Sequence, residues 1–176
     1  MTAFAIGTDK AMVVSKQHPS IVPSLLDRLI DEDPGQALEI VPLPAVRLEQ
    51  VKAAVRRDLE NLLNTRLYRR VPLDAYPELA RSVVNYGLPD FSTVLLGSAE
   101  HREHFRRTVQ ATIERFETRL RRVQVTLAPT AEEYQRSLHL KISALLMIEP
   151  APVPLLFDSR VRAHDREVKL RELRHG

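Results

Sequence analysis

The spacing of apolar residues predicts two long amphipathic helices in the first two thirds of the chain. Between residues 47 and 66, apolar side chains recur every three or four positions, with charged and amide side chains between them. A second stripe of the same period follows Ser98, which is a good N-cap, and extends to Leu120. The sequence also predicts two shorter helices, one opened by Ser24 and one over residues 77–83.

After Leu120 the apolar period changes to two, which predicts strands. The alternation runs through three segments, residues 121–128, 138–148 and 153–157. The second of these becomes apolar on both faces, as is typical of a central strand. Val168 and Leu170 alternate with charged residues and predict a charged edge strand over residues 166–171. Helices first and an antiparallel sheet last predict an α+β fold, with two long and one or two short helices packed on about four strands.

The chain is expected to form one domain between two tails. Its 176 residues are enough for one domain and too few for two comfortable ones. Residues 1–20 lack apolar periodicity and are expected to be a tail, residues 21–173 the domain, and residues 174–176 a second tail. Two prolines predict an extended connector over residues 36–46.

The composition excludes several classes of site. The chain has no cysteine, which excludes disulfides, thiolate catalysis, zinc fingers and iron–sulfur clusters, and which fits a reducing compartment. Its five glycines form no phosphate-binding loop and no dinucleotide fingerprint. No apolar run approaches the roughly 20 residues of a membrane span, and the first residues do not have the pattern of a signal peptide. We therefore expect no cofactor and no membrane insertion.

The charge is unevenly distributed. The net charge is +3, but residues 1–60 carry −2 and residues 61–176 carry +5, and arginine provides 21 of the 26 basic residues. Guanidinium groups suit protein interfaces as well as phosphates, although a genome that prefers arginine codons would give the same enrichment. Acidic residues interrupt the basic runs and no exposed aromatic platform accompanies them, so nucleic-acid binding is not expected.

Two pairs of residues invite a catalytic interpretation, and neither pair supports it well. His101 and His104 could share one face of a helix, but a catalytic zinc site normally needs three protein ligands and no third ligand is evident. Glu114 and Glu117 could act as paired carboxylates, but the chain has no tryptophan and only four tyrosines to line a sugar site. Solvated helix faces explain both pairs more simply.

Three motifs carry a resemblance to a known family. They are RRDLENLLNTR at residues 56–66, YPELARSVVNYGLPDFS at 76–92 and FETRLRRVQVTL at 116–127. In this order and spacing the chain resembles the TssE family of type VI secretion baseplate subunits. That family is similar to the wedge protein of contractile phage tails that was once labelled lysozyme-like. The resemblance extends over roughly residues 20–172.

The resemblance implies a structural protein rather than an enzyme. It implies a cytoplasmic wedge subunit of the baseplate docked on the inner membrane, where it binds TssF and TssG. It also implies that the subunit initiates the contractile sheath built of TssB and TssC. No small-molecule substrate, cofactor, metal or nucleic acid belongs to that role. A peptidoglycan-degrading enzyme and a soluble regulatory adaptor of similar fold remain the alternatives.

The family's Glu-Pro-Arg motif reads Glu117-Thr118-Arg119 in this chain. Proline would fix the backbone where the helix turns into the strand, and Thr118 does not. The resemblance implies that Glu117 and Arg119 face the helical bundle of the wedge. A local ion pair at the helix end is the alternative.

Two further groups of residues are expected at interfaces. Four residues are either interface groups or anchors of the following loop, namely Arg57, Asp58, Asn64 and Arg66. Tyr86 is the residue of its turn that is expected to project towards a partner. The second group is the last strand-like segment, which could pair with a strand of the sheath because a sheet edge has unpaired backbone groups. Its residues are Glu167, Val168, Lys169 and Leu170. An ordinary charged edge strand is the alternative.

Overall fold

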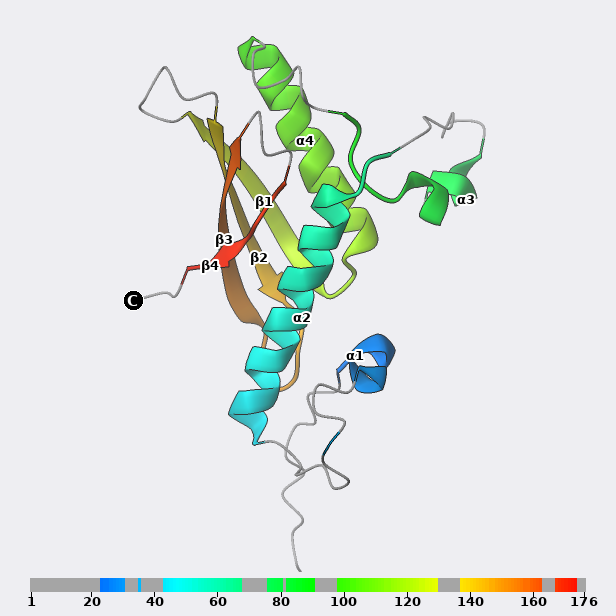
Figure 1. Ribbon diagram of the computed structural model, residues 1–176, viewed down its shortest axis with the longest axis vertical. Coiled ribbons are helices and arrows are strands. Elements are labelled where there is room, and N and C mark those ends of the chain that lie inside the picture. Colours follow the sequence, from blue (N-terminus) through cyan, green and yellow to red (C-terminus); the bar gives the residue numbers. More distant parts are fainter. Residues whose placement is uncertain are drawn as a thin grey trace, which may run out of the picture.

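The computed structural model describes residues 23–30, 35, 43–67, 76–80, 82–90, 98–129, 137–162 and 167–173. Both expected tails, residues 1–20 and 174–176, lie outside these residues. So do residues 130–136, which connect the first two strands. Two long helices lie against one face of a four-stranded sheet, and short helices project beside them (Figure 1). The predicted α+β fold is therefore confirmed.

The helices begin where local chemistry favours a helix end. Their bounds are α1 Leu25–Leu29, α2 Pro44–Asn64, α3 Pro77–Ala80, the 3-10 helix η1 Val83–Asn85, and α4 Ala99–Phe116. Ser24 caps α1 by accepting the Asp27 N–H, and Ser98 caps α4 by accepting the His101 N–H, as the sequence predicts. The prediction over residues 77–83 is only partly right, because α3 and η1 are separate helices there.

Residues 36–42 of the expected connector over residues 36–46 lie outside the described residues, and its end is wrong. Helix α2 begins at Pro44, three residues before the predicted start at residue 47. Proline is well suited to the first helical position, because the N–H that it lacks would have no partner inside the helix. Pro44 therefore opens α2.

The sheet is antiparallel throughout, with the strand order β1-β2-β3-β4. The strands are β1 Leu120–Pro129, β2 Ser137–Leu146, β3 Val153–Arg162 and β4 Arg171–Glu172. Ile142 of β2 pairs with Val125 on one side and with Phe157 on the other, which confirms the prediction of a central strand. The register shifts between Arg121 and Gln124, a position that includes Arg122 with φ 52°.

The predicted fourth strand is wrong in its position. Only Arg171 and Glu172 form ladder pairs with β3, and residues 167–170 are not part of a strand. We refer to residues 167–173 as the C-terminal segment. Side chains of α2 take the place of a neighbouring strand, because Asn64 bonds both the carbonyl (2.9 Å) and the N–H (2.7 Å) of Val168. The alternation of apolar and charged residues in this segment thus predicted which side chains are buried, but not that α2 rather than a strand bonds its backbone.

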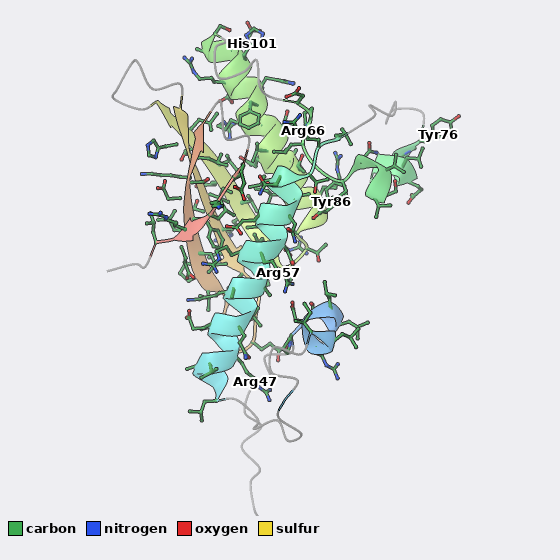
Figure 2. All side chains as sticks on the ribbon, viewed as in Figure 1. Arg47, Arg57, Arg66, Tyr76, Tyr86 and His101 are labelled. Carbon is green, nitrogen blue, oxygen red and sulfur yellow. The ribbon has the colours of Figure 1, made fainter. Side chains whose placement is uncertain are left out.

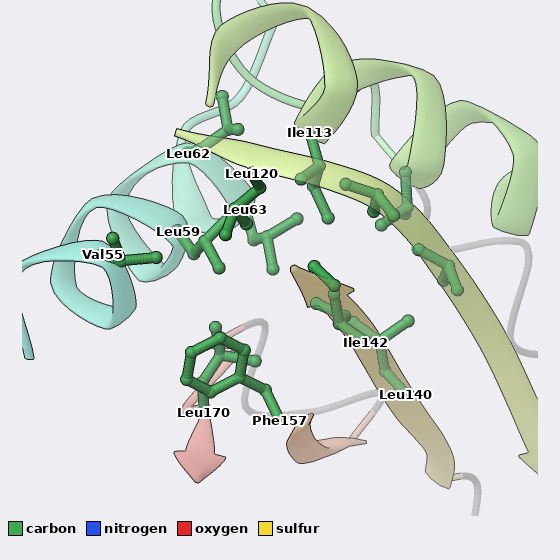
Figure 3. Close-up of a cluster of buried hydrophobic side chains, with 14 of the residues drawn as sticks. Val55, Leu59, Leu62, Leu63, Ile113, Leu120, Leu140, Ile142, Phe157 and Leu170 are labelled. Carbon is green, nitrogen blue, oxygen red and sulfur yellow. The ribbon is translucent and has the colours of Figure 1, made fainter. Parts of the chain in front are cut away.

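The core lies between the two long helices and the sheet (Figure 3). Val55, Leu59 and Leu63 of α2 and Val109 and Ile113 of α4 supply the helical side of this core. The sheet supplies alternate residues of its strands, namely Leu120, Val123, Val125, Leu140, Ile142, Ala144, Leu146, Leu155 and Phe157. The C-terminal segment contributes the buried side chains of Val168 and Leu170. The stripe predicted after Ser98 is confirmed except at its end. Phe116, the last residue of α4, is only partly buried, and Leu120, to which the stripe was expected to extend, is the buried first residue of β1.

Candidate partner-binding site

The junction between α4 and β1 is held by an acid and a base two residues apart. Glu117 is the C-cap of α4 and is buried, with 6% of its surface exposed. Its Oε1 accepts hydrogen bonds from the backbone N–H (3.1 Å) and from Nε (2.8 Å) of Arg119, and its Oε2 lies 2.5 Å from Arg119 Nη2. The local pair considered from the sequence is therefore present. The Glu117 carboxylate thus bonds Arg119 across the exposed Thr118.

Asp58 of α2 joins this pair to a second arginine. Its Oδ2 lies 2.6 Å from Arg119 Nη2, and its Oδ1 accepts from both Nε (3.1 Å) and Nη2 (3.0 Å) of Arg57. Two-point bonding of this kind fixes the plane of a guanidinium as well as its position. The residues that the motifs singled out on α2 and at the end of α4 thus form one continuous group.

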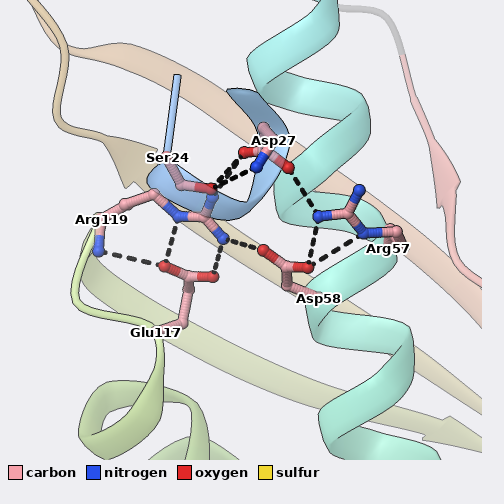
Figure 4. Close-up of polar contacts among 6 residues, drawn as sticks. All are labelled: Ser24, Asp27, Arg57, Asp58, Glu117 and Arg119. Atoms are coloured by element: carbon pink, nitrogen blue, oxygen red, sulfur yellow. Dashed lines mark hydrogen bonds and ion pairs between the residues drawn. The ribbon is translucent and has the colours of Figure 1, made fainter. Parts of the chain in front are cut away.

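Helix α1 completes the group with a third carboxylate. Asp27 Oδ1 lies 2.7 Å from Arg57 Nη2, and Asp27 Oδ2 lies 4.0 Å from Arg119 Nη1 and 2.6 Å from Ser24 Oγ. We call Asp27, Arg57, Asp58, Glu117 and Arg119 the charge cluster (Figure 4). Three carboxylates and two guanidiniums give it a formal charge of about −1 at neutral pH.

The ion pairs shift the ionisation of three members of the charge cluster. Burial acts to raise the pKa of Asp27, but the hydrogen bonds from Ser24 and Arg57 and the charge of Arg57 leave it below its ordinary value. Hydrogen bonds to Glu117, opposed by burial, raise the pKa of Arg119 far above its ordinary value. The pKa of Arg57 is raised by its hydrogen bonds to Asp27 and Asp58. All three groups are therefore charged at neutral pH, and the cluster is an ionic site.

Tyr86 lies beside the charge cluster. Its ring packs edge-on against Phe116, with 5.3 Å between the ring centroids. Burial raises the pKa of Tyr86, and the negative charges of Asp58 and Glu117 raise it further. Tyr86 is half-buried, so only part of its ring can project towards a partner as the sequence predicts.

The turn that carries Tyr86 is anchored against the end of α2. Leu88 donates its N–H to the Thr65 carbonyl (2.8 Å) and accepts the N–H of Leu67 (2.8 Å). Gly87 has φ +108°, and a Cβ there would lie 2.4 Å from the Thr65 carbonyl oxygen, so only glycine fits. Arg66 bridges to Leu88 through its backbone and is exposed (Figure 2). The backbone of Arg66 therefore anchors the loop, which was one of the two alternatives predicted for this residue. Its side chain remains accessible.

The predicted residues of the C-terminal segment do not join the charge cluster. Glu167 and Lys169 are exposed and lie 3.5 Å apart at Oε2 and Nζ, whereas Val168 and Leu170 are buried in the core of the chain itself. Within the described residues, no hydrogen bond or ion pair connects this segment to the cluster. The expected interface residues thus fall into two separate groups.

The remaining candidates for chemistry are surface groups. Glu114 is exposed and accepts a hydrogen bond from Gln110 (3.1 Å), so it does not face a common site with the buried Glu117. His101 lies in the first turn of α4, with its Nδ1 2.9 Å from Ser98 Oγ. Across the described ranges, no group of three His, Cys, Asp or Glu side chains could hold a metal ion. Of the helices that the structure describes, none has the length and apolar character that a bilayer span requires.

Sequence reasoning missed Asp27 as a member of the site. The sequence marks Asp27 only as a residue of the first turn behind the Ser24 cap. Its ionic partners Arg57 and Arg119 lie 30 and 92 positions further along the chain. Nothing in the local pattern could connect an acid in a short helix with arginines so distant.

The charge cluster lies in an α+β domain, where α1, α2 and the junction of α4 and β1 meet. The family of the baseplate wedge protein gp25 matches residues 49–151. The chain belongs to this baseplate wedge family, which confirms the resemblance predicted from the motifs.

The matched region contains four members of the charge cluster and excludes the fifth, Asp27, and the C-terminal segment. One solved structure, described as the baseplate complex from the type VI secretion system, contains a similar chain. The TM-score is 0.46 at 21% identity, and the alignment covers 65% of this chain and 96% of that chain. No curated protein matches the chain.

Proposed function

We propose that this chain is the wedge subunit of a type VI secretion baseplate, that it binds TssF and TssG, and that it initiates the contractile sheath. One observation carries the proposal most strongly. Residues that the wedge motifs contribute from three parts of the sequence meet at one place, the charge cluster with Tyr86 beside it. Membership of the baseplate wedge family supports the general role.

The charge cluster is suited to holding the fold and contacting a partner at once. Glu117 is buried within it, whereas 40% of the Arg57 side chain and 25% of the Arg119 side chain remain exposed. A guanidinium has five N–H donors and can bind an internal carboxylate on one edge and a partner on the other. The wedge interface then consists of Arg57, Asp58, Arg66, Tyr86, Glu117 and Arg119.

The C-terminal segment is the proposed place of sheath attachment. Val168 and Leu170 bury their side chains and bond α2 through their backbones, so they hold the segment against the domain. Glu167 and Lys169 face outwards, with side chains 61% and 76% exposed. Their opposite charges would discourage indiscriminate pairing while they permit a matched strand of TssB or TssC.

A structural role without catalysis follows from the same proposal, together with a location in the cytoplasm at the inner-membrane-docked baseplate. The lysozyme-like alternative would need a free carboxyl group that can act as an acid. Glu117 accepts three hydrogen bonds from Arg119 instead. Clearing of a peptidoglycan suspension by the pure protein, lost on Glu114→Gln, would favour the enzyme.

The test of the wedge role uses the exposed Arg66 because Glu117 is buried. Reversing the charge of Glu117 would leave Arg119 facing a buried cation, so the variant is not expected to fold normally. Arg66→Glu changes an exposed side chain, and Arg121→Glu makes the same change at an exposed position of β1. We expect Arg66→Glu to reduce co-purification with TssF and TssG by more than about tenfold, and Arg121→Glu to leave it unchanged. Equal retention of both variants would contradict the wedge interface.

A further inference from the structure

Helix α1 is held to the domain by charge rather than by apolar packing. Leu25, Leu26 and Leu29 are 72%, 58% and 74% exposed, and no residue of α1 is buried. Among the described residues, the hydrogen bonds and ion pairs that join α1 to other elements are those of Asp27 with Arg57 and Arg119. A five-residue helix is not stable in water on its own, so the position of α1 depends on this carboxylate. The contacts that hold α1 thus lie outside the apolar core of the domain.

The two arginines beside Asp27, Arg57 at 2.7 Å and Arg119 at 4.0 Å, do not need it for their own position. Asp58 bonds Nε and Nη2 of Arg57. Glu117 bonds Nε and Nη2 of Arg119, and Asp58 also bonds Arg119 Nη2. These carboxylates belong to α2 and to the end of α4, which pack in the core. Removal of α1 would leave both guanidiniums oriented, with Arg57 Nη2 and Arg119 Nη1 facing the vacated place (Figure 4).

The third carboxylate of the charge cluster is the exchangeable one. Asp58 and Glu117 alone balance the two arginines, so Asp27 brings the formal charge of the cluster from zero to −1. The site accepts this additional carboxylate because two guanidiniums converge on it. A carboxylate carried on a larger binding surface would compete with one carried on a helix held outside the core.

We propose that Arg57 and Arg119 form a carboxylate-binding site, which Asp27 occupies in the isolated subunit and which an acidic side chain of a wedge partner takes over during assembly. Helix α1 then acts as an internal competitor that keeps the site filled until the partner arrives. The site itself follows from the geometry, whereas the identity of the partner rests on the proposed wedge function.

The ligand chemistry can be tested without the partner. The probe is fluorescently labelled hexaglutamate, added to the full-length chain at constant ionic strength, with binding followed by anisotropy. Asp27→Asn should tighten binding about fivefold or more, because the internal competitor is lost. Arg57→Gln added to Asp27→Asn should abolish that gain. Arg56→Gln, which removes the same charge from the neighbouring exposed position, should preserve it. A thermal melt of each variant shows that the domain is folded.

Two outcomes would overturn the carboxylate site. Unchanged affinity in Asp27→Asn would show that Asp27 does not fill it, and equal losses from Arg56→Gln and Arg57→Gln would show non-specific binding to basic side chains. Affinity for TssF and TssG is then measured separately, and Asp27→Asn should increase it several-fold. A decrease would mean that docked α1 is itself part of the interface, which would overturn the exchange. If no variant and no wild-type protein binds TssF or TssG, the proposed wedge function fails, while the hexaglutamate result still decides the site.

Discussion

At the scale of single residues, Glu117 combines two tasks that its neighbour Glu114 does not share. Its carboxylate accepts the backbone N–H of Arg119 where α4 ends, and it also bonds the Arg119 side chain at two points. Glu114 lies one turn earlier on the same helix and is exposed. The two glutamates therefore make a matched pair for measuring what burial and pairing contribute.

Glu117→Gln should lower the free energy of unfolding by about 1–3 kcal/mol, because the amide cannot bond both edges of Arg119 and leaves that guanidinium without its nearest counter-charge. Glu114→Gln should change it by less than about 0.5 kcal/mol, as expected of an exposed substitution. Urea titration of both variants measures the difference. Similar small losses would show that Glu117 is not the support of the junction.

At the scale of elements, the apolar periodicity of the sequence predicted the helices and strands whose structure is decided by burying one of their own faces. It predicted α4 and its Ser98 cap, the change to strand period after Leu120, and the central position of β2. It failed where a partner far along the chain decides. The C-terminal segment lost its expected strand because Asn64 and Glu60, more than 100 positions earlier, bond its backbone.

The candidate site shows the same division. The family motifs identified Arg57, Asp58, Glu117 and Arg119 as candidates, because each residue lies within a motif of its own segment. That the four residues form one cluster could not be read from the sequence, since the contact between Asp58 and Arg119 spans 61 positions. Asp27 belongs to no motif, and only the structure places it there.

The attachment of the C-terminal segment to α2 can be tested at Asn64. Asn64→Ala removes both hydrogen bonds to Val168 and leaves a backbone donor and acceptor with no partner, so the free energy of unfolding should fall by about 1–3 kcal/mol. Asn61→Ala, at an exposed position one turn earlier, should cost less than about 0.5 kcal/mol. Chemical denaturation provides both values. If the variants behave alike, water replaces the side chain of Asn64 without loss.

At the scale of the whole molecule, α2 is the common support of the two groups proposed to face other proteins. It holds α1 through Arg57 and the junction of α4 and β1 through Asp58. It also holds the C-terminal segment through Asn64 and Glu60. Because these contacts are polar and lie outside the apolar core, the proposed release of α1 would leave that core in place.

Docking of α1 should therefore depend on pH through Asp27. Its pKa in the folded chain is below the ordinary value, so the charged carboxylate contributes stability that is complete above the ordinary pKa of about 4 and is lost as the pH falls through the lowered value. Facing it are Arg57 and Arg119, which remain cationic, with Asp58 and Glu117 behind them.

The docking of α1 can be followed with a spin label attached to a single cysteine. Because the chain has no cysteine, Arg28→Cys at an exposed position of α1 provides the one attachment point. The mobility of the label should rise below about pH 4, before the domain melts. In Asp27→Asn it should be high at every pH. A label equally restrained in that variant would show that α1 is held by something other than Asp27.

In the assembled baseplate, the C-terminal segment should control the attachment of the sheath. The backbone hydrogen bonds from the segment to α2 run through Val168 and Leu170, so Lys169→Pro leaves those bonds in place while it removes a backbone donor between them. If a sheath strand pairs with this segment, the Lys169→Pro variant should form far fewer sheaths although wedge binding persists.

The control is Lys169→Ala, which removes the exposed side chain but keeps the N–H. This variant should form nearly normal numbers of sheaths. Fluorescent-sheath imaging in cells counts the assemblies, and co-purification with TssF and TssG reports the wedge. Normal sheaths in Lys169→Pro would place the joining strand elsewhere, and loss of wedge binding in that variant would show that the segment supports the domain rather than the sheath.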